Sequence, residues 1–350
     1  MKYDLLSMTD GEFTEFVAQC GLPKYRGGQI IEWLMRGADY SEMTNLPKNV
    51  RQYLSENCLP LPKIEKKLVS AIDGTVKYLF ALSDGQCVES VVMKYEYGNT
   101  ICVSSQVGCR MGCRFCASTL GGLVRSLTVG ELLGQVITAQ KDTGERISGI
   151  VLMGIGEPLD NYENVVRFIQ TAGREDRLGI GLRHISLSTC GVVPMIDRLA
   201  EEELPITLSI SLHASDDQRR SELMPINRKY PLDALLRSCA AYFEKTGRRI
   251  SFEYTLIDGV NDSDSDADAL VKLLRKYFPA PTPLHVNLIP VNTVEERGFI
   301  RSKRADAFAE KLNARRVNAT VRRRLGSDIN ASCGQLRRQT LAEKAEEVKQ

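Results

Sequence analysis

Residues 100–120 read TICVSSQVGCRMGCRFCASTL, and this stretch decides how the rest of the chain is interpreted. It places three thiols, Cys109, Cys113 and Cys116, in a C-x3-C-x2-C pattern. The polar residues and glycines between them indicate a loop rather than a packed strand or helix. Three thiols this close on a loop suggest a metal, although unrelated buried thiols are the simple alternative.

The number of thiols narrows the kind of metal site. A structural zinc site normally has four protein ligands, and no histidine or fourth cysteine stands nearby at a usual spacing. Iron–sulfur clusters are held by cysteine thiolates, most often four, and a 4Fe-4S cluster with three cysteines keeps one iron open to another ligand. The missing fourth ligand therefore favours such a cluster, with zinc as the alternative.

The pattern, with Phe115 directly before its last cysteine, resembles the signature of radical S-adenosylmethionine (SAM) enzymes. In that superfamily the open iron binds the amino and carboxylate groups of SAM. The resemblance implies one 4Fe-4S cluster bound by Cys109, Cys113 and Cys116, with SAM on the open iron.

Length and composition describe an ordinary globular protein. The chain has 350 residues, of which 43% are hydrophobic and 26% charged, enough for one large α/β domain or two domains. No apolar run approaches the roughly 18 residues of a membrane span, and no signal-peptide pattern is present, so we expect a cytoplasmic protein with no membrane partner. The net charge of +2 does not by itself indicate nucleic acid.

The chain divides into four predicted parts. Residues 1–62 have a helical texture and are expected to form an accessory domain that contacts RNA, an ordinary solvated helical surface being the alternative. Residues 63–99 predict a β-ribbon with turns at Asp73-Gly74 and Asp84-Gly85. Residues 100–295 predict the main α/β domain, and residues 296–350 a C-terminal extension.

Strands alternate with helices through the main domain. A capping box at Thr128 and Glu131 predicts one helix start. Six strand–helix units are too few to close an eight-stranded barrel, so the fold class is α/β, a partial (β/α)6 barrel with functional loops at the carboxyl ends of its strands. The predicted strands are residues 100–106, 147–153, 184–189, 206–212, 249–257 and 284–290.

Further motifs narrow the resemblance from superfamily to family. From about Pro23 to Leu336 the chain resembles the RlmN family, radical SAM enzymes that methylate C-2 of adenosine in 23S ribosomal RNA and in transfer RNA. The resemblance implies the peptidyl-transferase centre and the tRNA anticodon loop as target regions. The matching strings are CVSSQVGC (102–109), GIGEPLDN (154–161), LSTCGVVP (187–194), SISLHA (209–214), LMPIN (223–227), HVNLIPVN (285–292) and SDINASCGQL (327–336).

The resemblance also implies which residues contact SAM. A carboxylate suits the SAM ammonium, and glycine or small hydroxyl residues allow an adenosine to approach the backbone. From the residues alone, Gly154 and Gly156 could merely end a strand, and Glu157 could be an exposed turn carboxylate. The implied contacts are Gly156, Glu157, Ser188, Ser211, Leu212, His213 and Asn292.

Three residues are implied in the chemistry itself. Cys333 would take a methyl group from one SAM, and a second SAM would give the 5′-deoxyadenosyl radical that activates this methyl for addition to C-2. Glu89 would accept the C-2 proton, and Cys102 would resolve the RNA–protein adduct, leaving a Cys102–Cys333 disulfide. From the residues alone, Cys102 could be a buried strand thiol and Glu89 a solvent-facing carboxylate.

Basic residues surround Cys333 in the sequence, which favours contact with an RNA backbone over a merely solvated face. We also expect a monomer that receives electrons from a flavodoxin-type donor. Three rivals stay open: the related C-8 adenosine methyltransferases, a non-catalytic iron–sulfur electron carrier, and an RNA-binding module with a structural cluster. The basic residues are Arg301, Lys303, Arg304, Arg315, Arg316, Arg322, Arg323, Arg324, Arg337 and Arg338.

Overall fold

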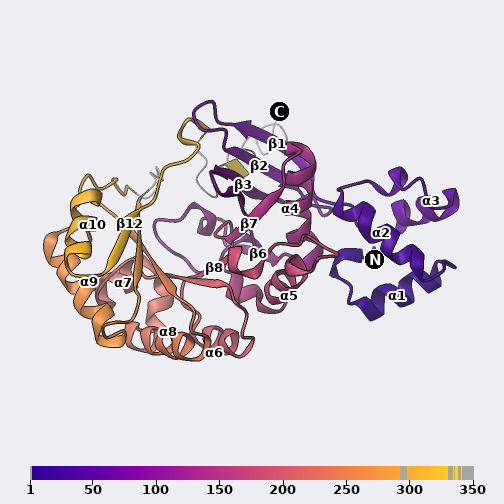
Figure 1. Ribbon diagram of the computed structural model, residues 1–350. Helices are drawn as coiled ribbons and strands as arrows, with labels where there is room; N and C mark the ends of the chain where they lie inside the picture. The colour runs from indigo at the N-terminus through magenta and orange to yellow at the C-terminus, as the bar shows by residue number, and fades with distance from the viewer. Residues whose placement is uncertain (1, 292–297, 330–333, 335, 338–339, 341–350) are drawn as a thin grey trace.

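The computed structural model describes residues 2–291, 298–329, 334, 336–337 and 340. The chain begins with a group of three helices that lies to one side of the main body (Figure 1). Thr9 starts the first helix because its hydroxyl accepts the Glu12 N–H while the Glu12 carboxylate accepts the Thr9 N–H. The three helices are α1 (Asp10–Gln19), α2 (Tyr25–Met35) and α3 (Lys48–Asn57).

One ten-stranded sheet runs through the rest of the molecule, in the order β1-β2-β3-β4-β7-β8-β9-β10-β11-β12. The first three strands are antiparallel, and they correspond to the predicted ribbon: β1 (Lys63–Val69), β2 (Val76–Ala81) and β3 (Cys87–Tyr95). From β4 onward neighbouring strands are parallel. These are β4 (Gly98–Cys102), β7 (Ile147–Leu152), β8 (Ile185–Thr189), β9 (Thr207–Ser211), β10 (Ile250–Leu256), β11 (His285–Pro290) and β12 (Asn318–Val321).

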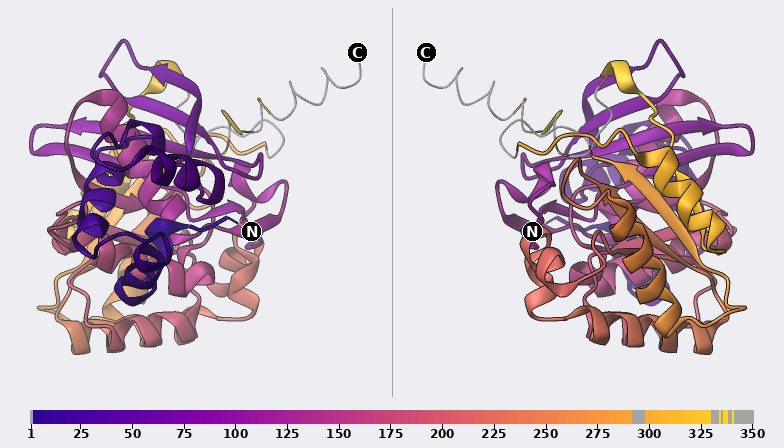
Figure 2. Two further views of the ribbon diagram at one scale, coloured as in Figure 1. Left: turned by 90° about the vertical axis from the view of Figure 1, so that its right-hand side faces the viewer. Right: turned by 90° about the vertical axis from the view of Figure 1, so that its left-hand side faces the viewer.

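Helices follow the parallel strands and bury apolar side chains against the sheet. All six predicted strands have counterparts in the sheet, the helices predicted between them are present, and the mixed α/β fold class is confirmed. The structure adds α7 and a final α10–β12 unit that the sequence did not predict; α9, α10 and β12 lie side by side in orange to yellow in Figure 2, right. The helices are α4 (Val129–Thr143), α5 (Tyr162–Gly173), α6 (Val193–Glu201), α7 (Asp217–Leu223), α8 (Leu232–Thr246), α9 (Asp264–Tyr277) and α10 (Ala305–Ala314).

One predicted strand is wrong in extent. Residues 100–106 do not form a single strand, because β4 ends at Cys102 and the backbone then leaves the main sheet. The Ser104 N–H donates to the Gln135 side chain, and the Ser104 hydroxyl donates to the Glu89 carbonyl. The chain resumes as β5 (Gln106–Gly108), which pairs with β6 (Leu123–Ser126) in a separate two-stranded sheet.

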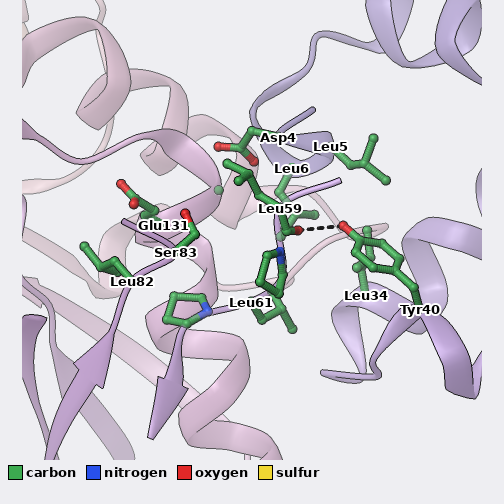
Figure 3. A pocket seen from close by; sticks show the side chains of 13 residues that line it. Asp4, Leu5, Leu6, Leu34, Tyr40, Leu59, Leu61, Leu82, Ser83 and Glu131 are labelled. Atoms are coloured by element: carbon green, nitrogen blue, oxygen red, sulfur yellow. Dashed lines mark hydrogen bonds between the residues drawn. The ribbon is translucent and has the colours of Figure 1, made fainter. Parts of the chain in front are cut away.

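The N-terminal helical group is held against the start of α4. The Asp4 carboxylate accepts hydrogen bonds from the hydroxyls of Ser7 and Thr128, each at 2.6 Å. A Cβ atom on Gly130 would lie 2.1 Å from an Asp4 oxygen, so only glycine allows this approach. Figure 3 shows this junction, where the Tyr40 hydroxyl donates to the Leu59 carbonyl at 2.7 Å. In the part of the chain described above, no helix is both long and apolar enough to cross a membrane.

Candidate active site

The three-cysteine loop follows β5 and is fixed by backbone hydrogen bonds. The Cys109 N–H donates to the Gly122 carbonyl at 2.9 Å. Gly108 has a φ of +81°, and a Cβ there would lie 2.0 Å from the same carbonyl, so the close return of the loop requires glycine. The Thr119 hydroxyl donates to the carbonyls of Cys113 and Cys116 and closes the loop around the last two cysteines.

The thiols lie in a setting that disfavours their ionisation. Burial raises the pKa of Cys109 to about 12, and Glu157 and Cys116 act in the same direction. Burial likewise raises the pKa of Cys113, helped by its two neighbouring cysteines. A bound cation reverses this preference, because metal ligation deprotonates a thiol outright.

The donor set fits a polynuclear cluster better than a single ion. Among the residues that the structure describes, no group of three or more His, Cys, Asp or Glu side chains is arranged to hold one metal ion. A cluster makes no such demand, because each thiolate binds a different iron.

The loop after β7 packs closely on the segment after β4. A Cβ on Gly154 would lie 2.6 Å from the Val103 carbonyl oxygen. Gly156 has a φ of +111°, and a Cβ there would lie 2.7 Å from both the Gln106 Cβ and the Ser105 hydroxyl. Both glycines are therefore required for the close approach of these two segments.

Glu157 is buried at this junction, with 3% of its surface exposed. Its carboxylate accepts the Cys190 N–H at 2.7 Å and the Leu159 N–H at 3.0 Å, so it joins the loops after β7 and β8. Burial raises its pKa, and the backbone donors oppose that shift. The alternative of an exposed turn carboxylate is wrong.

Serines form a polar face inside the curved sheet. Ser188 on β8 and Ser211 at the end of β9 are both half-buried, whereas the intervening Leu187 and Ile210 are buried in the apolar core. The hydroxyls of Ser186 and Ser209 lie 3.2 Å apart across the two strands. Because side chains alternate along a strand, the apolar residues face the helices and the hydroxyls face the interior.

His213, with its neighbour Leu212, follows β9 and is buried. Its Nδ1 accepts the Thr255 N–H at 2.9 Å, and its ring lies edge-on to Phe115, with 4.8 Å between ring centroids. Burial lowers the His213 pKa to about 3, with a smaller contribution from the Arg220 charge. His213 is therefore neutral at physiological pH and supports the cysteine loop through Phe115.

Arg220 is a residue that the sequence analysis missed. It is fully buried on α7, and its guanidinium donates to the carbonyls of Leu212, Ser211 and Cys190 and to the Asn227 side chain. It thereby ties the ends of β8 and β9 together beneath the cysteine loop. Its position in the sequence, beside Arg219 in a charged segment, gave no signal of burial.

Glu89 lies inside the protein on β3, with 2% of its surface exposed, so the alternative of a solvent-facing carboxylate is wrong. It forms a buried ion pair with Lys77, with 3.2 Å between nitrogen and oxygen. One carboxylate oxygen accepts the Gly334 N–H at 2.9 Å, and the other accepts the Arg337 N–H at 2.6 Å. Glu89 thus anchors the C-terminal segment.

The same segment contacts the cysteine loop. Gly334 has a φ of +82°, and a Cβ there would lie 3.0 Å from the backbone nitrogen of Ser118, two residues after Cys116. The residue that follows Cys333 therefore lies between Glu89 and the cysteine loop. Cys333 itself and Asn292 lie outside the described residues.

Cys102 is buried at the end of β4, where it packs with Val91 and Met93. No disulfide joins two of the residues that the structure describes. The implied partner, Cys333, is not among them, so the Cys102–Cys333 disulfide stays a prediction without structural support.

A mostly parallel α/β sheet, with a three-cysteine loop and a glycine-rich loop beside it, defines a radical SAM enzyme. Residues 103–274 match the family model described as the radical SAM superfamily, which implies a 4Fe-4S cluster and SAM. Residues 3–59 match the ribosomal RNA large subunit methyltransferase N-terminal domain.

Curated relatives and a solved structure narrow the class to one family. The chain is 53% identical to a probable dual-specificity RNA methyltransferase RlmN of Alkaliphilus oremlandii, over 97% of this chain and 99% of the relative. It is 48% identical to the protein of the same name from Clostridium novyi, over 96% of this chain and 98% of that relative. A radical SAM methyltransferase from Sphaerobacter thermophilus superimposes with a TM-score of 0.89 at 43% identity, covering 95% of this chain and 98% of that one. The chain belongs to the RlmN family of radical SAM RNA methyltransferases.

Proposed function

We propose that this enzyme methylates C-2 of adenosine, in 23S rRNA at the peptidyl-transferase centre and in the tRNA anticodon loop, by way of a methyl group carried on Cys333. The observation that carries the proposal is the docking of Gly334 on both Glu89 and the cysteine loop. This contact brings the chain next to Cys333 to the place where the cluster would be held.

Cys109, Cys113 and Cys116 would hold the 4Fe-4S cluster, which leaves one iron for SAM. When bound, the cluster would supply the reductive cleavage of SAM to the 5′-deoxyadenosyl radical, with electrons from a flavodoxin-type donor. Each turnover would use two SAM molecules, one to methylate Cys333 and one as the radical source. We propose that the enzyme does so as a cytoplasmic monomer.

Those proposed SAM contacts that the structure describes lie at or just after the carboxyl ends of the parallel strands. Glu157 presents a buried carboxylate to the SAM ammonium, and Gly156 leaves room at the backbone. The half-buried hydroxyls of Ser188 and Ser211 suit the ribose or the carboxylate of SAM. Leu212, His213 and Asn292 complete the proposed set.

Glu89 is the proposed acceptor of the C-2 proton. Two backbone N–H groups and the Lys77 ammonium contact its carboxylate and fix its position beside the segment that contains Cys333. We propose that Cys102 then resolves the RNA–protein adduct by forming the disulfide with Cys333. The burial of Cys102 at the inner end of β4 suits a thiol that reacts only inside the barrel.

Replacing Gly156 with alanine should abolish measurable SAM binding. The added Cβ would meet Gln106 and Ser105 at 2.7 Å, which forces the two loops apart. Equilibrium SAM binding to the cluster-loaded variant measures the effect. Gly85→Ala is the control, because Gly85 also has a positive φ, +81°, but nothing lies within 4 Å of its added Cβ. Equal SAM affinity in Gly156→Ala and wild type would contradict the proposed contact.

The reaction product tests the proposed function against its rivals. Anaerobic incubation with SAM, a reductant and an RNA stem–loop, followed by nucleoside analysis, should yield 2-methyladenosine. A yield of 8-methyladenosine would instead assign the enzyme to the C-8 branch. RNA that binds but gains no methyl group, with or without 5′-deoxyadenosine, would contradict the proposal.

A further inference from the structure

A large cavity runs along the interior side of the parallel sheet and includes its end away from the cysteine loop. Its volume is about 900 Å³, and its walls include the first residues of β7, β8 and β9, such as Ser148, Ile185 and Thr207. The cysteine loop and the proposed SAM contacts lie at the opposite, carboxyl ends of these strands. The cavity is therefore a second entrance to the interior of the barrel.

The mouth of this cavity is strongly basic. Arg146 and Arg183 precede β7 and β8, whereas Arg322 and Arg323 follow the carboxyl end of β12, and all four line the cavity and are exposed. No Asp or Glu is among the described residues that line it. None of these four arginines is among the arginines that form ion pairs in the described chain. The charge of Arg322 acts at longer range on the buried Glu253, where it opposes the rise in pKa that burial causes. A set of cations without carboxylates on a cavity wall is suited to an anionic ligand.

Other arginines of the predicted basic set behave differently. Arg304 forms an ion pair with Asp264, and Arg315 forms one with Asp268. Those two side chains are already neutralised on the outer helices. Arg322 and Arg323, on the cavity, are thus better placed than Arg304 and Arg315 to meet phosphate groups.

Two tyrosines form an exposed aromatic platform beside the arginines. Tyr95 at the end of β3 and Tyr97 in the following turn are stacked, with 5.0 Å between ring centroids and 6° between ring planes. Both line the cavity, and 78% of Tyr97 is exposed to solvent. An exposed ring that is stacked on a second ring offers a surface on which a nucleobase can stack.

The inner wall of the cavity lies next to Cys102, one of the residues of the proposed mechanism. Met93, Val151 and Met153 line the cavity, and they also pack in the cluster that contains Cys102. A volume of about 900 Å³ lies in the upper part of the range of roughly 300–1,000 Å³ found for ligand sites, and therefore has room for a flipped nucleotide.

We propose that this cavity is the entrance for the RNA substrate. The adenosine enters through this cavity, between the amino ends of β7 and β8 and the carboxyl end of β12. The neighbouring phosphates contact Arg146, Arg183, Arg322 and Arg323, and an adjacent base stacks on Tyr97. RNA then approaches the centre through an opening other than the loops that hold the proposed SAM contacts. This inference rests on the proposed function, because it assumes that the anionic ligand is RNA.

Binding of a fluorescently labelled tRNA anticodon stem–loop to the full-length, cluster-loaded protein tests the entrance. Tyr97→Ala should weaken binding by about tenfold through the loss of base stacking, whereas Tyr97→Phe should bind like wild type. Arg183→Ala should weaken binding and also lower the slope of log Kd against log salt by about one, the signature of one lost phosphate contact. Arg237→Ala is the matched control, because Arg237 is equally exposed but is paired with Asp233 on α8.

The side chains of Tyr97 and Arg183 are exposed, so wild-type circular dichroism and thermal unfolding are expected for both variants. If both variants bind RNA as tightly as wild type with an unchanged salt slope, the entrance proposal is wrong. A separate experiment measures whether Cys333 becomes methylated in the wild-type protein when SAM is present and RNA is absent. Its failure would overturn the proposed function, whereas its success alongside unaffected RNA binding by the variants would overturn only the entrance.

Discussion

Replacing Cys113 with alanine should eliminate SAM cleavage, so that no 5′-deoxyadenosine forms above background. The loop offers three thiols, and removing one leaves the cluster with two protein ligands and a second open iron. The expected result is a large loss of bound iron together with the loss of the nucleoside product. Iron analysis and chromatography after anaerobic reconstitution measure both.

Cys20→Ala provides the matched control for this experiment. Cys20 lies at the end of α1 in the N-terminal helical group and is half-buried like Cys113. It should keep full iron loading and full production of 5′-deoxyadenosine. A Cys113→Ala protein that still cleaves SAM at the wild-type rate would show that the cluster is held elsewhere.

Replacing Glu89 with alanine should lower the free energy of unfolding by about 3–5 kcal/mol, the usual cost of removing one member of a buried ion pair. The change takes the carboxylate from Lys77, of which only 1% is exposed, and takes the acceptor from the N–H groups of Gly334 and Arg337. The C-terminal segment should also become more sensitive to proteases. Denaturant unfolding and limited proteolysis measure the two effects.

Glu145→Ala is the control for the loss of a carboxylate. Glu145 pairs with Lys94 at the surface, where both side chains are about 40% exposed. An exposed pair contributes only about 0–1 kcal/mol, so this variant should unfold almost like wild type. If Glu89→Ala and Glu145→Ala have equal effects on unfolding, Glu89 does not anchor the segment that contains Cys333.

Regular elements of the core could be predicted because their signals are local. The capping box at Thr128 marks the observed start of α4, where Thr128 and Glu131 exchange the expected hydrogen bonds. The turns at Gly74 and Gly85 separate the strands of the ribbon, as expected for glycines with positive φ. In contrast, β12 is four residues long and half of its residues are exposed, which leaves too little apolar pattern to detect.

Burial of charged residues could not be predicted in the same way. Arg220 is buried because the carbonyls of Cys190 and Leu212 accept from its guanidinium, and Lys77 is buried because Glu89 on the neighbouring strand β3 pairs with it. A sequence pattern does not reveal such partners. For Glu89 and Glu157, the residues alone left an exposed position open, and only the family resemblance favoured a site. The early end of β4 at Cys102 was also not predictable, because it depends on hydrogen bonds from Ser104 to Gln135 and Glu89, which lie elsewhere in the chain.

The central claim is that Cys333 carries the methyl group, and peptide mass mapping tests it most directly. The anaerobically purified, cluster-loaded protein is incubated with SAM and digested, and the peptide that contains Cys333 is weighed. We predict one added methyl group on Cys333 and none on Cys239, which is fully buried on α8. An unmodified Cys333 in protein that holds its cluster and binds SAM would contradict the account.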